Sequence, residues 1–154
     1  MLNHVEITRG HWDVKDVRLN GSPLRLMPGR SSRSIWTDEI VVVKVDQGTP
    51  QAQREAETWL TLSPEDRQYF AALLAVGANF VVQEFVPLCK GEDGEAWELA
   101  DKLFMKYTLA WDWQGWNQFG VDLRTGLLCI HDYPCDEYPG ESYSWETLNL
   151  TRAA

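Results

Sequence analysis

The chain has 154 residues, 44% of them hydrophobic and 24% charged, which is ordinary for one globular domain with a buried core. Its net charge of −9 argues against nonspecific nucleic-acid binding, because that binding needs a basic surface that displaces counterions. No apolar run approaches the roughly 20 residues that span a bilayer, and the N-terminus lacks the basic-then-apolar pattern of a signal peptide. We therefore expect a cytoplasmic protein that binds neither nucleic acid nor membrane.

The first third of the chain carries strand patterns. Asn20-Gly21 is a turn signal, residues 28–33 form a loop rich in small residues, and Asp38-Glu39 predicts a tight turn. The strongest strand signal is a β-branched run that contains one lysine, Lys44. The strands are expected over residues 14–19, 23–27, 34–37 and 40–45.

The rest of the chain mixes helices and strands. Thr49-Pro50 and Ser63-Pro64 are helix starts, and residues 95–111 have the longest helical periodicity. Helices are expected over residues 51–60, 63–77 and 95–111, a strand over 79–86, and a hairpin over 118–121 and 127–131. This order predicts an α+β fold.

The three cysteines are an odd count that does not suggest a secreted disulfide framework. The segment 129–135, Cys-Ile-His-Asp-Tyr-Pro-Cys, allows a Cys/His metal cluster. A strand that packs Cys129 and Ile130 inward is the better interpretation.

Each residue that could support chemistry also has an ordinary structural explanation. A lysine in an apolar strand, such as Lys44, is more often an edge residue whose ammonium reaches water. Glu55 would usually lie on a solvated helix face, and Asp132 would usually be a turn residue or cap. Only their order along the chain favours a common function.

That order resembles the protein-kinase-like superfamily. The loop that contains Gly29, Ser31 and Ser32 is similar to a reduced form of the glycine-rich loop that covers nucleotide phosphates in the family. Lys44 is similar to the strand lysine that contacts those phosphates, and Glu55 to the helix glutamate that pairs with it.

The resemblance continues through the second half of the chain. Backbone groups near Glu84 and Val86 would meet the adenine at a hinge between two lobes, with Gln83 at the back of the pocket. Asp112 and Asn117 keep the Asp-x4-Asn spacing of the catalytic loop, in which the aspartate positions the acceptor and the asparagine binds a metal.

Asp132, at the end of the predicted hairpin, resembles the second metal ligand of the family. The resemblance implies one kinase-like domain over residues 1–154. Residues 1–86 would form an antiparallel N-lobe sheet with helices and the hinge, and residues 87–154 would form a minimal C-lobe. It also implies ATP and Mg²⁺ as cofactors.

Several positions depart from the family pattern. The phosphate loop has one glycine where three are usual, Gln114 stands where a lysine is common, and Pro134 replaces the glycine after the Asp-aromatic pair. Only 22 residues follow Asp132, so we expect no full activation segment or substrate lobe.

Three functions remain open. We favour a minimal ATP-dependent phosphotransferase that uses a hydroxyl acceptor, with Lys44 and Asp112 as catalytic residues and a partner protein or a second copy completing the site. The alternative is a weak or inactive pseudokinase that acts as an interaction or regulatory protein. A third reading is an unrelated α+β domain, in which Lys44 would be exposed and far from Glu55 and Asp132.

Overall fold

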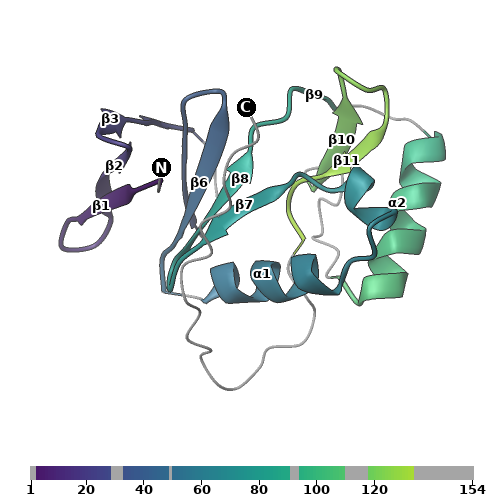
Figure 1. Ribbon diagram of the computed structural model, residues 1–154, viewed down its shortest axis with the longest axis horizontal. Helices are drawn as coiled ribbons and strands as arrows, with labels where there is room; N and C mark the ends of the chain where they lie inside the picture. The colour runs from purple at the N-terminus through teal and green to yellow at the C-terminus, as the bar shows by residue number, and fades with distance from the viewer. Residues whose placement is uncertain (1–2, 29–32, 49, 91–93, 110–117, 134–154) are drawn as a thin grey trace. The chain divides into compact units, whose positions relative to one another are not determined.

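The computed structural model describes residues 3–28, 33–48, 50–90, 94–109 and 118–133 (Figure 1). The described residues divide into two compact units, the first comprising residues 3–53 and 73–85 and the second residues 54–72 and 86–133. Each unit has its own hydrophobic core. Two α-helices and mainly antiparallel sheets make up the fold, which confirms the predicted α+β class.

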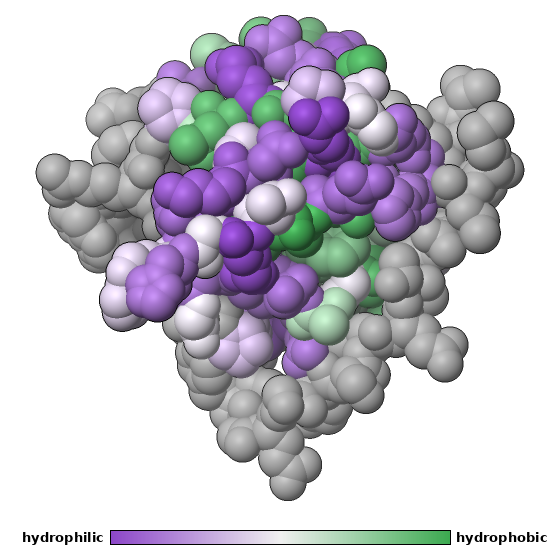
Figure 2. All heavy atoms as spheres, turned by 90° about the vertical axis from the view of Figure 1, so that its left-hand side faces the viewer, coloured by the Kyte–Doolittle hydropathy of each residue, from purple (hydrophilic) through white to green (hydrophobic). Residues whose placement is uncertain are grey.

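A small antiparallel sheet begins the first unit. Its strands are β1 (Val5–Arg9), β2 (Val14–Leu19) and β3 (Ser22–Pro23), in the order β1-β2-β3. The predicted turn after β2 is confirmed, since Asn20 and Gly21 both have positive φ angles, 52° and 82°. Strand β1 was not predicted, although Val5 and Ile7 alternate with polar residues, because the run is short and none of its side chains is fully buried. The surface that faces the viewer in Figure 2 is mostly hydrophilic.

A five-stranded antiparallel sheet is the centre of the first unit. Its order is β4-β5-β6-β8-β7, and Figure 1 shows β6, β7 and β8 side by side. The strands are β4 (Arg25–Leu26), β5 (Arg33–Thr37), β6 (Val41–Asp46), β7 (Leu73–Val76) and β8 (Phe80–Glu84). The predicted strands over 34–37, 40–45 and 79–86 are therefore confirmed, with small shifts at their ends.

The predicted strand over residues 23–27 is split between the two sheets. Pro23 pairs with Arg18 of β2, whereas Arg25 pairs with Thr37 of β5. Between them, Leu24 is buried and donates its N–H to the carbonyl of Val17. The chain thus changes sheets at Leu24, which joins the two sheets through one buried side chain.

The core of the first unit lies between these sheets. Alternate residues of β6 point into it, as strand geometry requires. Its buried members are Val14, Val17, Leu24, Trp36, Val41, Val43, Val45 and Val82. Burial of β-branched side chains on one face explains why the run over residues 40–45 forms a central strand.

Helix α1 (Gln51–Thr61) follows β6 and confirms the helix predicted over residues 51–60. Its first turn is held by the carboxylate of Asp46, the last residue of β6. The Ala52 N–H donates to Asp46 Oδ2 at 3.0 Å and to Oδ1 at 3.2 Å. The carboxylate satisfies an amide that has no partner inside the helix, and its charge opposes the positive end of the helix dipole.

The second predicted helix, over residues 63–77, is wrong. Only Asp66–Tyr69 forms a short 3₁₀ helix, η1, and Phe70 is already extended, with φ −123° and ψ 141°. The Ala71 N–H donates to the Ile130 carbonyl, and β7 pairs with β8. Sheet pairing of the apolar run 73–76 therefore overrides its helical pattern, an ambiguity that periodicity cannot resolve in short apolar runs.

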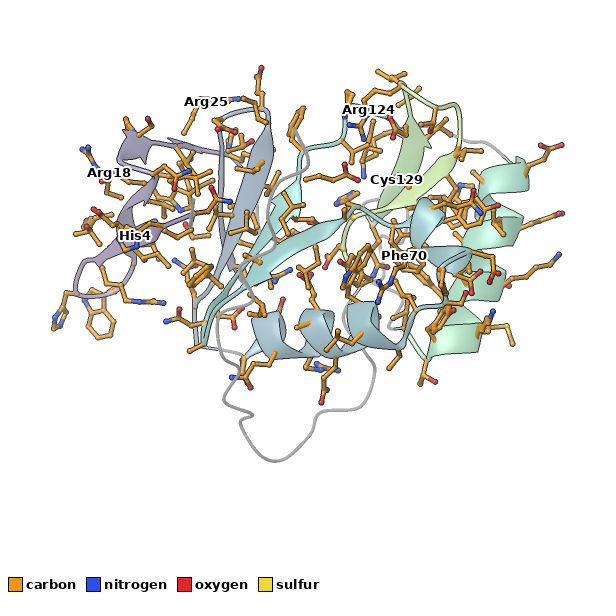
Figure 3. All side chains as sticks on the ribbon, viewed as in Figure 1. His4, Arg18, Arg25, Phe70, Arg124 and Cys129 are labelled. Carbon is orange, nitrogen blue, oxygen red and sulfur yellow. The ribbon has the colours of Figure 1, made fainter. Side chains whose placement is uncertain are left out.

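The second unit contains a small antiparallel sheet and helix α2 (Gly94–Tyr107). Strands β9 (Leu88–Cys89), β10 (Phe119–Asp122) and β11 (Leu128–Ile130) form the sheet in the order β11-β10-β9, which confirms the predicted hairpin. The buried core members are Leu62, Phe70, Ala96, Ala100, Leu103, Phe104, Leu109, Phe119, Leu128, Ile130 and Tyr133. Figure 3 shows Phe70 and Cys129 in this unit, and the predicted inward packing of Cys129 and Ile130 is confirmed by their exposures of 4% and 0%.

Helix α2 ends four residues earlier than predicted. Thr108 has a positive φ of 54°, and the Leu109 N–H donates to the Phe104 carbonyl at 2.9 Å. This left-handed residue and the back-bonding amide form a C-terminal cap that stops the helix. Within the described residues, no helix has the length and apolarity needed to cross a membrane.

Two carboxylates of the second unit are fixed by cations. Asp66 accepts hydrogen bonds from Lys106 Nζ at 2.6 Å and from the Tyr107 hydroxyl, and these two bonds lower the pKa of Asp66 below its ordinary value of 3.8. Arg124 donates its guanidinium and its backbone N–H to Asp122, and these hydrogen bonds lower the pKa of Asp122. The contacts of Asp66 join η1 to the end of α2, and the contacts between Asp122 and Arg124 close the β10–β11 turn.

The cap on α1 can be tested by stability. Asp46→Ala removes the acceptor for the Ala52 N–H and should lower the free energy of unfolding by roughly 1–2 kcal/mol, the usual cost of a lost cap. Asp46→Asn keeps an acceptor oxygen and should lose less. Urea unfolding measures both, with Asp13→Ala, at an exposed carboxylate of the β1–β2 turn, as the matched control. An equal loss in the Asp13 variant would contradict the assignment.

The Asp66 contacts predict an acid-dependent stability. Because the folded-state pKa of Asp66 is lowered, its contribution is fully present above about pH 4 and is lost as the pH falls through the folded value. Asp66→Asn should therefore be less stable than the wild type at neutral pH, and the difference should shrink toward zero in strong acid. Urea unfolding at several pH values between about 7 and 2 measures this difference in the free energy of unfolding. Asp101→Asn, at an exposed position of α2, is the control. A difference that does not change with pH would show that the contacts are not those of an ionised carboxylate.

Candidate functional site

Lys44 lies on the face of the five-stranded sheet that points away from the valine core. Val43 and Val45 enter the core, so Lys44, between them, projects from the other face of β6. Its side chain is buried, with a residue exposure of 5%. This contradicts the reading of Lys44 as an exposed edge residue, and it removes one expectation of the unrelated-domain hypothesis.

Buried polar side chains share this face with Lys44. The register of the sheet pairs Arg33 with Asp46, Ile35 with Lys44, and Thr37 with Val42 on neighbouring strands. It also pairs Gln83 of β8 with Val42. The buried polar residues that surround Lys44 on the face are Arg33, Thr37, Asp46 and Gln83. Gln83 thus lies on the same face of the sheet as Lys44.

This face is unusual because sheet faces of small domains are normally apolar when buried. Charged groups are rarely buried unless they are paired, since their transfer out of water costs several kcal/mol. Arg33 and Asp46 are directly opposite each other on β5 and β6, a position in which Cβ atoms are about 5 Å apart. The strands thus place two cations, Arg33 and Lys44, and the carboxylate of Asp46 on one buried face.

The carboxylate on this face also fixes the next element. Asp46 accepts the Ala52 N–H, so the start of α1 is tied to the strand that carries Lys44. Glu55 comes one turn later in α1 and is completely buried, with an exposure of 0%. The solvated helix face that an isolated glutamate would predict is therefore wrong for Glu55.

The segment proposed as the hinge begins at the end of β8. The Phe85 N–H donates to the Ile40 carbonyl at 3.1 Å, so the backbone groups of Phe85 point toward β6. Backbone direction alternates along a strand, and the N–H and C=O of Glu84 therefore point to the other side. The chain passes from the first unit to the second between Phe85 and Val86, and Val86 packs with Ala71 and Cys129.

Asp132 lies in the second unit, two residues after β11. It is half-buried, and its N–H donates to the Gln118 carbonyl at 3.3 Å, as does the His131 N–H at 2.9 Å. These bonds hold the backbone of Asp132 against the start of β10. Strand β11 leads into the segment that contains Asp132, and Cys129 of the same strand packs with Val86.

The remaining predicted site residues lie outside the described residues. They are Gly29, Ser31 and Ser32 of the phosphate loop and Asp112 and Asn117 of the catalytic loop. Among the described residues, no three His, Cys, Asp or Glu side chains form a metal-binding group. The donor set proposed for Mg²⁺ consists of the Asp132 carboxylate and the Asn117 amide, and hard oxygen donors of this kind are the ligands that Mg²⁺ prefers.

Sequence reasoning missed the polar neighbours of Lys44. Arg33 was assigned to the end of a loop, whereas it is the first residue of β5, and Asp46 was given no role. For Asp46 the local signal was weak, because a capping aspartate normally stands directly before the first helical residue, whereas Asp46 ends β6 and α1 begins at Gln51. For Arg33 no local signal existed, since only the register of β5 against β6 makes it a neighbour of Asp46.

The chain was compared with family models, with curated proteins and with solved structures, and none of them matches it. The assignment of a function therefore rests on the residues described above.

Proposed function

We propose that this chain is a minimal kinase-like protein that binds ATP with Mg²⁺ and transfers the γ-phosphoryl group to a hydroxyl acceptor. The observation that carries the proposal is the burial of Lys44 in the third strand of an antiparallel sheet, directly before a helix that buries Glu55. In protein kinases the nucleotide lysine is on the third strand, and its glutamate partner is on the helix that follows.

The order of elements supports the same proposal. Counted along the five-stranded sheet, β4 and β5 flank the loop proposed for the phosphates, β6 carries Lys44, and β8 leads into the hinge. Chance matches to single residues would not require a sheet with this order. The buried Arg33 on the face of Lys44 adds positive charge where an anionic ligand is proposed.

Each proposed site residue would have a separate role. Lys44 would contact the phosphates and Glu55 would orient its ammonium, while the Glu84 carbonyl and the Val86 amide would meet the adenine. Asp132 and Asn117 would hold Mg²⁺, which neutralises charge on the phosphates when bound. Asp112 would position the acceptor hydroxyl and accept its proton. Catalysis of this kind depends mainly on positioning and charge stabilisation, so it does not demand a large scaffold.

The second candidate is a regulatory protein with a kinase-like sheet and no transfer activity. Burial of Lys44 and Glu55 also fits a purely structural role for both charges, since buried ions are retained in some proteins for specificity of folding. In that case the nucleotide would bind weakly or not at all. A binding measurement, rather than an activity assay, separates the two candidates.

Nucleotide binding should raise the melting temperature. At an ATP concentration about 100 times Kd with excess Mg²⁺, the folded state gains about 2.7 kcal/mol, or about 5–10 °C for a chain of this length. Asp132→Asn should lose the magnesium-dependent part of the shift, and Lys44→Met should lose most of it. Differential scanning calorimetry measures each variant against its own nucleotide-free baseline.

Two exposed residues of α2 give the matched controls. Asp101→Asn and Lys102→Met make the same changes of charge outside the proposed site and should keep the wild-type shift. No shift in the wild-type chain at millimolar MgATP would reject nucleotide binding and favour the regulatory candidate. A shift that survives in Asp132→Asn and Lys44→Met would place the nucleotide elsewhere.

A further inference from the structure

Tyr133, the residue after Asp132, is completely buried and makes a hydrogen bond that the proposed function does not use. Its exposed fraction is 0%, and its hydroxyl donates to the Ala71 carbonyl at 3.3 Å. A buried tyrosine hydroxyl needs a partner, because leaving it without one costs free energy, so this bond favours one orientation of the ring. Tyr133 therefore anchors the backbone directly after the aspartate that is proposed to bind Mg²⁺.

The ring of Tyr133 packs edge-to-face against Phe70, which is labelled in Figure 3. Their ring centroids are 5.3 Å apart and their planes are at 88°. Tyr107 of α2 contacts Phe70 in the same way, with centroids 6.3 Å apart and planes at 90°. The hydroxyls of the two tyrosines have different partners. Tyr133 donates to the Ala71 carbonyl, whereas Tyr107 donates to the carboxylate of Asp66.

Ala71 holds the chain on both sides of Asp132. The Ala71 N–H donates to the Ile130 carbonyl at 2.8 Å, and the Ala71 carbonyl accepts the Tyr133 hydroxyl. Between these two contacts, the Asp132 N–H donates to the Gln118 carbonyl at 3.3 Å. The short segment that carries Asp132 is thus held before the aspartate, at the aspartate and after it.

We propose that Tyr133 is a positioning residue for the Mg²⁺ site, because its hydroxyl fixes the backbone from which the Asp132 carboxylate extends. This inference rests on the proposed function, in which Asp132 binds the metal, and it adds a residue that touches neither metal nor nucleotide. A carboxylate that is already held in place loses less freedom on binding, and the strict octahedral geometry of Mg²⁺ makes the position of each ligand important. Loss of the Tyr133 hydroxyl should therefore weaken the magnesium-dependent part of nucleotide binding.

The first measurement needs no ligand. Amide hydrogen exchange, followed by NMR, gives the rates for the His131 and Asp132 amides, which are both hydrogen-bonded in the fold. Tyr133→Phe keeps the buried ring and removes the hydroxyl, and loss of this bond should speed exchange of the two amides roughly fivefold. Tyr107→Phe is the matched control and should leave both rates unchanged, whereas a general loss of stability would speed exchange in both variants.

The second measurement tests the metal. Isothermal titration calorimetry gives Kd for ATP with excess Mg²⁺ and for ATP with EDTA, in the wild-type chain and in the two tyrosine variants. Tyr133→Phe should weaken binding of ATP with Mg²⁺ by roughly three- to tenfold and leave binding in EDTA unchanged. Tyr107→Phe should match the wild type under both conditions.

Equal weakening of ATP with Mg²⁺ and in EDTA would overturn the inference, because it would assign Tyr133 only to the stability of the core. Equal effects of the two tyrosine variants would do the same. Unchanged exchange rates, or an unchanged Kd for ATP with Mg²⁺ in Tyr133→Phe, would also overturn it. Failure of the proposed function gives a different result, since the wild-type chain would then bind no ATP with or without Mg²⁺.

Discussion

The carboxylate of Asp46 is the constraint on which the first unit depends. The Asp46 side chain accepts the N–H of Ala52 in the first turn of α1, the Asp46 N–H donates to the Asn79 carbonyl, and the Asp46 carbonyl accepts a hydrogen bond from the guanidinium of Arg9. One residue therefore ties the end of β6 to the helix, to the turn before β8 and to the small sheet. Because Asp46 also lies on the face of Lys44, the same bonds that fix the fold fix the surroundings of the lysine.

Burial of charge on that face works against the stability of the unit. A sheet face covered with valine would be easier to fold than one that contains Arg33, Lys44, Asp46 and Gln83, because polar groups must recover in the fold the hydrogen bonds that they lose from water. Departures from a simple hydrophobic pattern are expected at functional sites, because some stability is given up there to hold polar groups in a fixed arrangement. The opposite face of β6 follows the simple pattern, with Val41, Val43 and Val45 all nearly inaccessible to water. The contrast between the two faces of one strand is the strongest structural reason to associate Lys44 with a ligand.

Predictions from the sequence succeeded where local patterns decide the structure. The β-branched run of β6, the Pro-initiated α1 and the β10–β11 hairpin were all predictable, because strand propensity, capping and turn residues act over a few positions. The helix predicted over 63–77 was wrong because strand β8 pairs with the apolar run over residues 73–76. The split at Leu24 could not be predicted, because the residues on its two sides pair with different sheets. Lys44 and Glu55 were proposed as site residues from their order along the chain, and this assignment stays a prediction.

Two cations of the second unit contribute to its fold through carboxylates. Arg124 is a turn-closing residue because Asp122 accepts both its backbone and its guanidinium, and Lys106 joins α2 to η1 through Asp66. Such pairs use charge to stabilise local geometry, and their removal affects stability first.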